Sequence, residues 1–197
     1  PAEGLSETSV GAAAHARAVA AGVIAQVVPA VDAAGWEKLK SVCAELPGLY
    51  PAYGLHPMYL QAHRPPHLDE LARWIEREAP VALGECGLDY FVEGLYHDLQ
   101  QHYFDGQLRL ARDFDLPVIV HARRAVDAVI ASIRKIGGLR GVVHSFSGSA
   151  EQAGQLHKLG FLLGAFSKTI EAEILKNLDT LLAKNEARPA ARKSAKK

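Results

Sequence analysis

Short apolar runs alternate with amphipathic stretches along most of the chain. Apolar runs of strand length, rich in β-branched residues, predict six strands: 22–28, 49–55, 81–84, 117–120, 141–143 and 161–164. Apolar positions with a helical period predict helices between and after them: 36–46, 67–78, 97–113, 124–135 and 169–183. Ser149 and Gln152 form a capping box, which predicts one more helix starting there.

Strands this apolar, separated by helices, indicate an α/β protein with a parallel sheet buried on both faces. Two architectures fit: an open doubly wound sheet and a (β/α)8 TIM-type barrel. No glycine-rich dinucleotide fingerprint follows any strand, which disfavours the doubly wound sheet. A full barrel has eight strands and about 250 residues. We therefore predict an incomplete barrel with about six of its eight strands, and two open sheet edges that a helix or a second copy could cover.

Charge divides the chain into two parts. Residues 184–197 carry six basic side chains and one acidic one, a net charge of +5, whereas residues 1–183 carry −5. We predict a barrel domain over 1–183 and a disordered basic tail over 184–197. No apolar run is long enough for a membrane helix, and no secretory signal is visible. Two cysteines, Cys43 and Cys86, form no disulfide framework, which favours a reducing, cytoplasmic location.

Polar residues stand where the predicted strands end. His56, Glu85, His121 and His144 follow four successive strands. The working surface of a parallel α/β sheet lies at the carboxyl ends of its strands, so we expect these side chains to converge on one rim. A carboxylate and several imidazoles at one point suit a divalent metal ion. The remaining histidines are interpreted as lying away from the site. His15 is read as an exposed helix residue and His63 and His67 as loop residues, and the others are on helices far from the rim: His97, His102 and His157.

Five segments carry a family resemblance when taken in order. They are Gly54-Leu55-His56-Pro57, Gly84-Glu85-x-Gly87-Leu88-Asp89-Tyr90, Gln101-x-x-Phe104-x-x-Gln107-Leu108, Pro117-Val118-Ile119-Val120-His121-x-Arg123 and His144-Ser145-Phe146-Ser147-Gly148. Together the segments resemble the TatD family of metal-dependent deoxyribonucleases, in the amidohydrolase-like barrel group.

The resemblance implies a barrel hydrolase that cleaves DNA phosphodiester bonds with Mg²⁺, Mn²⁺ or Zn²⁺. It implies Glu85, His121 and His144 as metal ligands. It places His56 and Asp89 near the site and makes Arg123 and Ser145 phosphate contacts. His56 is also the candidate general base.

The chain departs from the family pattern at both ends. The family opens with a His-x-His pair that supplies two metal ligands, and no such pair is present here. The family also has a late Glu-Thr-Asp-Ala-Pro-type motif, whereas the only aspartate after residue 164 is Asp179, in a predicted helix. We therefore expect truncation at both ends, one metal site instead of two, and weak or conditional activity.

Two alternative hypotheses remain open from the sequence. Barrels of this type hydrolyse many esters and amides, so the substrate could be an ester other than DNA. The chain could also be a catalytically silent remnant that binds nucleic acid through its basic tail.

Overall fold

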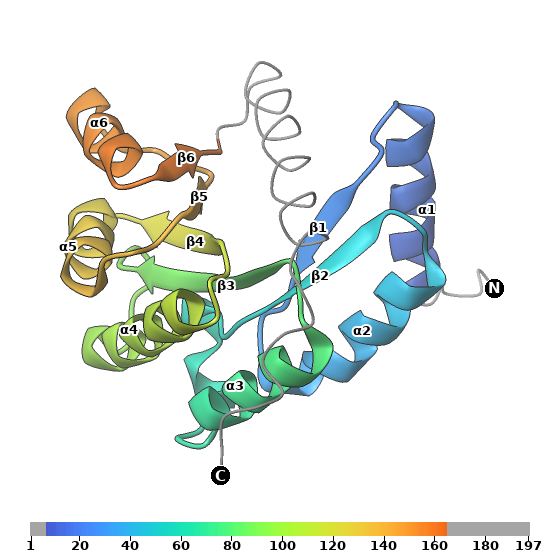
Figure 1. The fold of residues 1–197 in the computed structure, drawn as a ribbon, viewed down its shortest axis with the longest axis horizontal. Helices are drawn as coiled ribbons and strands as arrows, with labels where there is room; N and C mark the ends of the chain where they lie inside the picture. Colours follow the sequence, from blue (N-terminus) through green and yellow to red (C-terminus); the bar gives the residue numbers. More distant parts are fainter. Residues whose placement is uncertain (1–6, 165–197) are drawn as a thin grey trace, which may run out of the picture.

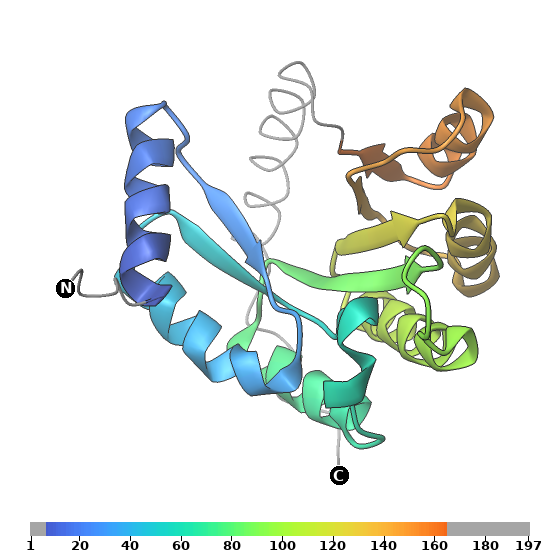
Figure 2. The same ribbon diagram turned by 180° about the vertical axis from the view of Figure 1, so that it is seen from behind.

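The computed structural model describes residues 7–164, which form one curved parallel sheet with helices along its outer side (Figures 1 and 2). The strands lie in the sheet in the order of the sequence. They are β1 (Gln26–Pro29), β2 (Leu49–Tyr53), β3 (Ala82–Asp89), β4 (Val118–Arg123), β5 (Gly141–His144) and β6 (Phe161–Leu163).

Helices alternate with these strands, as the sequence predicts. They are α1 (Glu7–Ala20), α2 (Trp36–Glu45), α3 (His67–Glu78), α4 (His97–Asp113), α5 (Val126–Ile136) and α6 (Ala150–Lys158), with short 3-10 helices η1 (Ala33–Gly35) and η2 (Pro57–Ala62). None of the helices within residues 7–164 is long and apolar enough to cross a bilayer.

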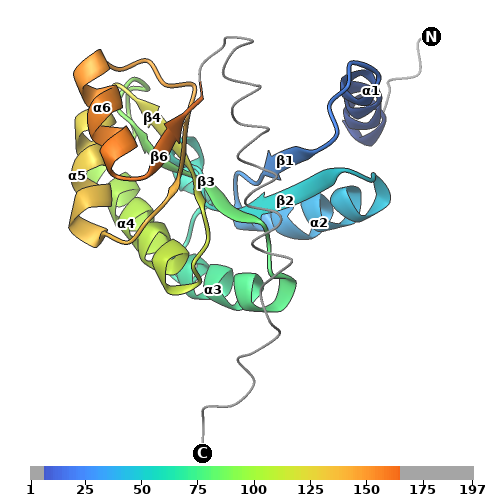
Figure 3. The ribbon, with the colours of Figure 1, turned by 45° about the horizontal axis from the view of Figure 1, so that its top comes forward.

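The strand order confirms the barrel-type prediction over the doubly wound alternative. A doubly wound sheet reverses its strand order at a switch point, whereas here each strand pairs with the next one in sequence. Within the described residues, β1 and β6 are the sheet edges, and α1 and α6 lie at opposite ends of the sheet (Figure 3). The predicted helix over 169–183 and the predicted tail over 184–197 lie outside the described residues.

Element boundaries match the sequence where amphipathic periodicity is strong, and differ at glycines and turns. The predicted helices 67–78 and 97–113 coincide with α3 and α4. The strand expected over 22–28 forms only from Gln26, and the preceding Ile24 is 74% exposed. The strand expected over 81–84 continues to Asp89, with Gly84 and Gly87 inside the sheet.

The core lies between the sheet and the helices that cover it. The α4 side chains Phe104 and Leu108 are fully buried together with Leu83 of β3 and Val118 of β4. Cys86 is also fully buried. This packing fixes the strands whose carboxyl ends carry the candidate site.

Two tryptophans pack between helices and the sheet. Trp36 of α2 and Trp74 of α3 have ring centres 5.6 Å apart, and the Tyr53 ring lies edge-on to both. The interpretation of His15 as an exposed residue is wrong. His15 is half-buried, with Nδ1 2.7 Å from Gln26 Oε1 and Nε2 3.1 Å from the Pro47 carbonyl oxygen, and so attaches α1 to the beginning of β1.

Candidate metal centre

The carboxyl ends of four neighbouring strands bring the candidate residues to one rim of the sheet. His56 follows β2, Glu85 and Asp89 belong to β3, His121 belongs to β4, and His144 ends β5. The parallel register pairs His121 directly with His144. Paired residues on neighbouring strands face the same side, so the sheet itself aligns these two imidazoles.

A β-bulge gives Glu85 its position. The register between β3 and β4 shifts here: Gly84 pairs with Ile119, but Cys86 already pairs with Val120, which leaves Glu85 as the extra residue. Bulges of this kind redirect a side chain and are common beside active sites. The sequence alone gives no signal for this irregularity.

Glycine at position 87 allows β3 and β4 to approach closely at the site. Gly87 pairs with His121 and has φ of +148°, and a Cβ atom there would overlap the His121 carbonyl oxygen. Because side chains alternate along a strand, Glu85 and Asp89 lie on the same side of β3, one on either side of Gly87. The imidazole of His121 therefore lies between two carboxylates.

The distances confirm this arrangement. His121 Nδ1 lies 3.2 Å from Glu85 Oε1, and His121 Nε2 lies 2.9 Å from Asp89 Oδ2. On the other side of Glu85, His56 Nε2 lies 3.5 Å from the same Oε1 atom. His56, Glu85 and His121 each offer one ligand atom within 4.8 Å of the others. This set of nitrogen and oxygen donors fits a divalent cation.

Asp89 orients the His121 ring. Its side chain is fully buried, and its Oδ1 atom accepts hydrogen bonds from the backbone N–H groups of Phe91 and Val92. These bonds leave Oδ2 directed at His121 Nε2. A carboxylate that holds one ring nitrogen in this way, while the other nitrogen faces the ligand position, is a common arrangement around metal-binding histidines.

The ionisation of the site residues follows from these contacts. Burial alone would raise the pKa of Glu85, but the hydrogen bonds from His121 and His56 and the nearby charge of His144 outweigh it and lower the pKa from 4.5 to about 2. Burial alone would lower the pKa of His121, but the two carboxylates outweigh burial and raise it. These contacts therefore favour an ionised Glu85 and the protonated form of the His121 imidazole.

His56 is held in a defined orientation at the beginning of η2. Its Nδ1 atom accepts a hydrogen bond from the Met58 backbone N–H at 3.2 Å, and its backbone oxygen lies 2.9 Å from Nε2 of the buried His63. Because Nδ1 is the acceptor, a neutral His56 ring carries its proton on Nε2. That N–H group points at Glu85.

Two buried glutamines of α4 fix the strand ends next to the site. Gln107 accepts a hydrogen bond from the Leu55 backbone N–H at 2.7 Å and donates one to the Leu55 carbonyl at 3.0 Å. Gln100, two helical turns earlier, makes the same pair of bonds with the Asp89 backbone, at 2.7 Å and 2.8 Å. One helix thus positions the residue before His56 and the residue that orients His121.

Comparison with known proteins identifies the family. The family model described as TatD related DNase matches residues 5–187. The chain belongs to this family. It is 40% identical over 151 residues to the uncharacterized metal-dependent hydrolase YjjV of Escherichia coli strain K12, which is 75% of this chain and 58% of that protein. It is 33% identical over 154 residues to the 3'-5' ssDNA/RNA exonuclease TatD of Pantoea sp. strain At-9b, covering 76% of this chain and 58% of the exonuclease.

A solved structure gives the same result for the fold. The crystal structure of the TatD homologue YjjV from E. coli K12 superimposes with a TM-score of 0.73 at 36% identity, over 81% of this chain and 63% of that one. The fold is therefore a TatD-type barrel fold. The chain spans less than two thirds of the length of these relatives.

Most predicted site residues of this TatD-family chain lie together, but three stand apart from the central cluster. His144 is exposed at the end of β5 and is outside the group of three ligand atoms, although its charge acts on Glu85. Arg123 ends β4, and its guanidinium lies over the Phe91 ring, 3.7 Å from the ring centre. Ser145 follows β5 with φ of +49°. Their predicted roles as ligand and phosphate contacts stay predictions.

Sequence reasoning missed the residues that support the site from behind. Gln100 has no role in the sequence analysis, and Gln107 appears there only as part of a recurring segment. His63 is interpreted there as a loop residue, whereas it is buried against the His56 backbone. The available signal was the seven-residue spacing of Gln100 and Gln107, which puts two polar residues on the buried face of an amphipathic helix.

Proposed function

We propose that this chain acts as a metal-dependent hydrolase that cleaves DNA phosphodiester bonds. The observation that carries the proposal is the His121 ring held between the Glu85 and Asp89 carboxylates at the strand ends. Membership of the TatD-related DNase family and the exonuclease activity for which the Pantoea relative is named support the choice of reaction.

Glu85, His121 and His144 are the proposed metal ligands. The Glu85 carboxylate remains ionised, and Asp89 holds Nε2 of His121, so that Nδ1 faces the position of the cation beside Glu85. When bound, a divalent ion polarises a phosphoryl oxygen and lowers the pKa of a water molecule. Mg²⁺, Mn²⁺ and Zn²⁺ all accept these donor types, and the donors do not choose among them.

His56 is proposed to act on protons rather than as a ligand. Coordination through Nε2 would require a proton on Nδ1 and would break the hydrogen bond from Met58. With that bond intact, His56 presents an N–H group to the site, suited to donate to an oxygen of the phosphodiester and to exchange a proton there. Glu85, whose Oε1 atom lies 3.5 Å from Nε2, holds this group in place.

Arg123 and Ser145 are the proposed phosphate contacts. A guanidinium stacked on an aromatic ring keeps the N–H groups at its edge available for an anion. Arg123 has this arrangement above Phe91, at the end of the strand that carries His121. Ser145 directly follows His144 and can direct its hydroxyl donor to the same phosphate.

Replacing His121 tests the proposal. We expect the wild-type chain to bind Mn²⁺ or Zn²⁺ in calorimetry and to cleave a labelled single-stranded oligodeoxynucleotide, and His121→Ala to lose both activities. The matched control is His157→Ala, which removes an exposed histidine on α6 and should change neither. Metal-independent cleavage, or unchanged metal binding in His121→Ala, would contradict the proposal.

The identity of the bond that is cleaved can be tested with small substrates. We compare methyl p-nitrophenyl phosphate, a phosphodiester, with p-nitrophenyl acetate, an acyl ester, at the same metal concentration. The proposal requires turnover of the phosphodiester. Turnover of the acyl ester alone would replace a nuclease with a hydrolase of another ester.

The proposed site predicts a pH-dependent metal affinity. The raised pKa of His121 means that the free site carries a proton that a cation has to displace, whereas Glu85 is ionised well below neutrality. Metal affinity should therefore rise with pH until His121 is neutral, by up to about tenfold per pH unit for one displaced proton. Calorimetry in two buffers of different ionisation enthalpy measures the released proton, and an affinity independent of pH between 6 and 8 would contradict this prediction.

A further inference from the structure

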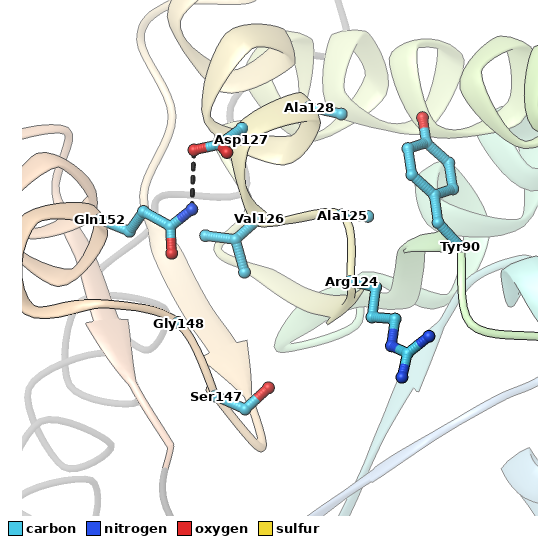
Figure 4. A pocket seen from close by; sticks show the side chains of 9 residues that line it. All are labelled: Tyr90, Arg124, Ala125, Val126, Asp127, Ala128, Ser147, Gly148 and Gln152. Carbon is cyan, nitrogen blue, oxygen red and sulfur yellow. Dashed lines mark hydrogen bonds between the residues drawn. The ribbon is translucent and has the colours of Figure 1, made fainter.

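A cavity of about 460 Å³ is lined by residues that follow the strands of the candidate metal centre (Figure 4). Its lining comes from the loops that follow β3, β4 and β5 and from the first turns of α5 and α6. Tyr90 is the residue after Asp89, Arg124 lies three residues after His121, and Ser147 lies three residues after His144. The strands that bring the metal centre together thus also position this cavity.

A stack of planar groups adjoins the cavity through Arg124, which lines the cavity and contacts the Phe91 ring. Phe91 is 43% exposed, although it is a large apolar residue. The Arg123 and Arg124 guanidinium carbons lie 3.7 Å and 4.6 Å from the centre of its ring. Flat aromatic and guanidinium surfaces are the surfaces on which single nucleobases stack, and arginine edges bind phosphate at the same time.

The arginine charges of this stack are available for a ligand. No ion pair within residues 7–164 involves Arg123 or Arg124. The one carboxylate in the lining, Asp127, accepts a hydrogen bond of 2.7 Å from Gln152. Figure 4 shows Arg124 and Tyr90 on one side of the cavity and Gln152 and Ser147 on the other. The lining therefore offers one cation and an aromatic ring on one side, and donors and acceptors on the other.

We propose that this cavity is a nucleotide-binding subsite that takes the base next to the phosphate held at the metal centre. The base stacks on the Phe91–arginine stack and directs its edge toward the polar side chains Ser147 and Gln152, while Arg124 contacts the backbone phosphate. The volume lies within the range of about 300–1,000 Å³ that is usual for small-molecule sites. The proposal rests on the proposed function, because it assumes that the strand's phosphate lies at the rim.

Equilibrium binding tests the subsite without cleavage. The probe is a 5'-fluorescein octamer of thymidylate, measured by fluorescence anisotropy with the full chain in EDTA. We expect Phe91→Ala and Arg124→Gln to weaken binding by about 5-fold to 100-fold each, the range for loss of a stacking or phosphate contact. The controls are Val19→Ala and Arg109→Gln, which remove an exposed apolar side chain on α1 and an exposed arginine on α4, and should change the affinity less than twofold.

Abasic probes separate base binding from general attraction to the backbone. An octamer with a run of abasic residues should bind the wild-type chain more weakly, and Phe91→Ala should weaken it no further, because the base and the ring form one contact. Phe91→Leu, which keeps an apolar side chain but removes the flat ring, should behave as Phe91→Ala does. Circular dichroism of each variant establishes that it is folded.

Each result decides the proposal. Equal affinity of Phe91→Ala, Arg124→Gln and the controls, no measurable octamer binding by the wild-type chain, or fully additive losses with the abasic probe would overturn the subsite. Turnover of methyl p-nitrophenyl phosphate, which has no base, tests the proposed hydrolysis separately. A chain that cleaves this compound but fails the octamer test has the proposed function without the subsite. A chain that passes the octamer test but does not cleave this compound has the subsite without the proposed hydrolysis.

Discussion

Replacing Glu85 with glutamine is expected to abolish metal-dependent cleavage and to lower the affinity for Mn²⁺ by at least about 100-fold. The change keeps the size of the side chain and removes one charge. Glu85 is the group at which His56 and His121 converge, with its Oε1 atom 3.5 Å from one imidazole and 3.2 Å from the other. An amide at this position offers a cation no charge, and it leaves His121 with one carboxylate partner instead of two.

Calorimetric titration with Mn²⁺ and the single-strand cleavage assay measure this loss. The matched control is Glu76→Gln, the same change at an exposed position of α3, which should bind metal as the wild-type chain does. Metal affinity of Glu85→Gln within tenfold of the control would show that the cation does not bind at this carboxylate.

The substitution Asp89→Asn tests whether Asp89 orients His121 or binds the metal ion itself. The asparagine oxygen can still accept from the Phe91 and Val92 N–H groups, but its amide would then face His121 Nε2 with a donor. We expect a loss of about 10-fold to 100-fold in metal affinity, the usual effect of an outer partner, and thus less than for Glu85→Gln. If Asp89→Asn lost more metal affinity than Glu85→Gln, Asp89 would be the ligand and Glu85 the residue that orients His121.

The parts of the site that the sequence predicts are those that depend on strand ends. Because parallel strands all point the same way, the polar residues after each apolar run had to meet at one rim, and His56, Glu85 and His121 do so. The same reasoning includes His144, but it cannot tell which of the histidines lie closest to Glu85. That ranking depends on the bulge at Glu85, which has no local signature in the sequence.

Glycines and glutamines show why the rest was out of reach. The predicted strand ends at Gly84, yet Gly84 and Gly87 both lie within β3, where Cβ atoms would overlap the backbone of β4. Glycine is needed there for a contact between strands, and a pattern read along one strand does not contain its neighbour. The Gln100 and Gln107 side chains likewise bind backbone groups 11 and 52 residues away in the sequence.

Replacing Gln107 with leucine is expected to destabilise the protein and also to weaken metal binding. The side chain is fully buried, and leucine has a similar volume, so the main loss is in hydrogen bonding. The Leu55 N–H and C=O groups would both remain buried without these partners, at a cost of about 1–3 kcal/mol each. Thermal unfolding should occur roughly 5–20 °C lower for a chain of this size.

The effect on the site distinguishes a positioning role from a merely structural one. Leu55 precedes His56, so its release should move the imidazole that contacts Glu85, and metal affinity should fall at temperatures where the variant is folded. Gln100→Leu, which releases the Asp89 backbone, should behave in the same way.

Gln101→Leu is the matched control on the same helix. The Gln101 side chain bonds to the Asp105 and Ser132 side chains instead of to a strand end, so its loss should lower stability and leave metal affinity unchanged. If all three variants lost stability and none lost metal affinity, α4 would be only a packing element. If metal affinity fell in Gln100→Leu and Gln107→Leu alone, the two glutamines would belong to the site as much as the side chains they position, because a metal centre built from strand ends is only as well ordered as the backbone of those ends.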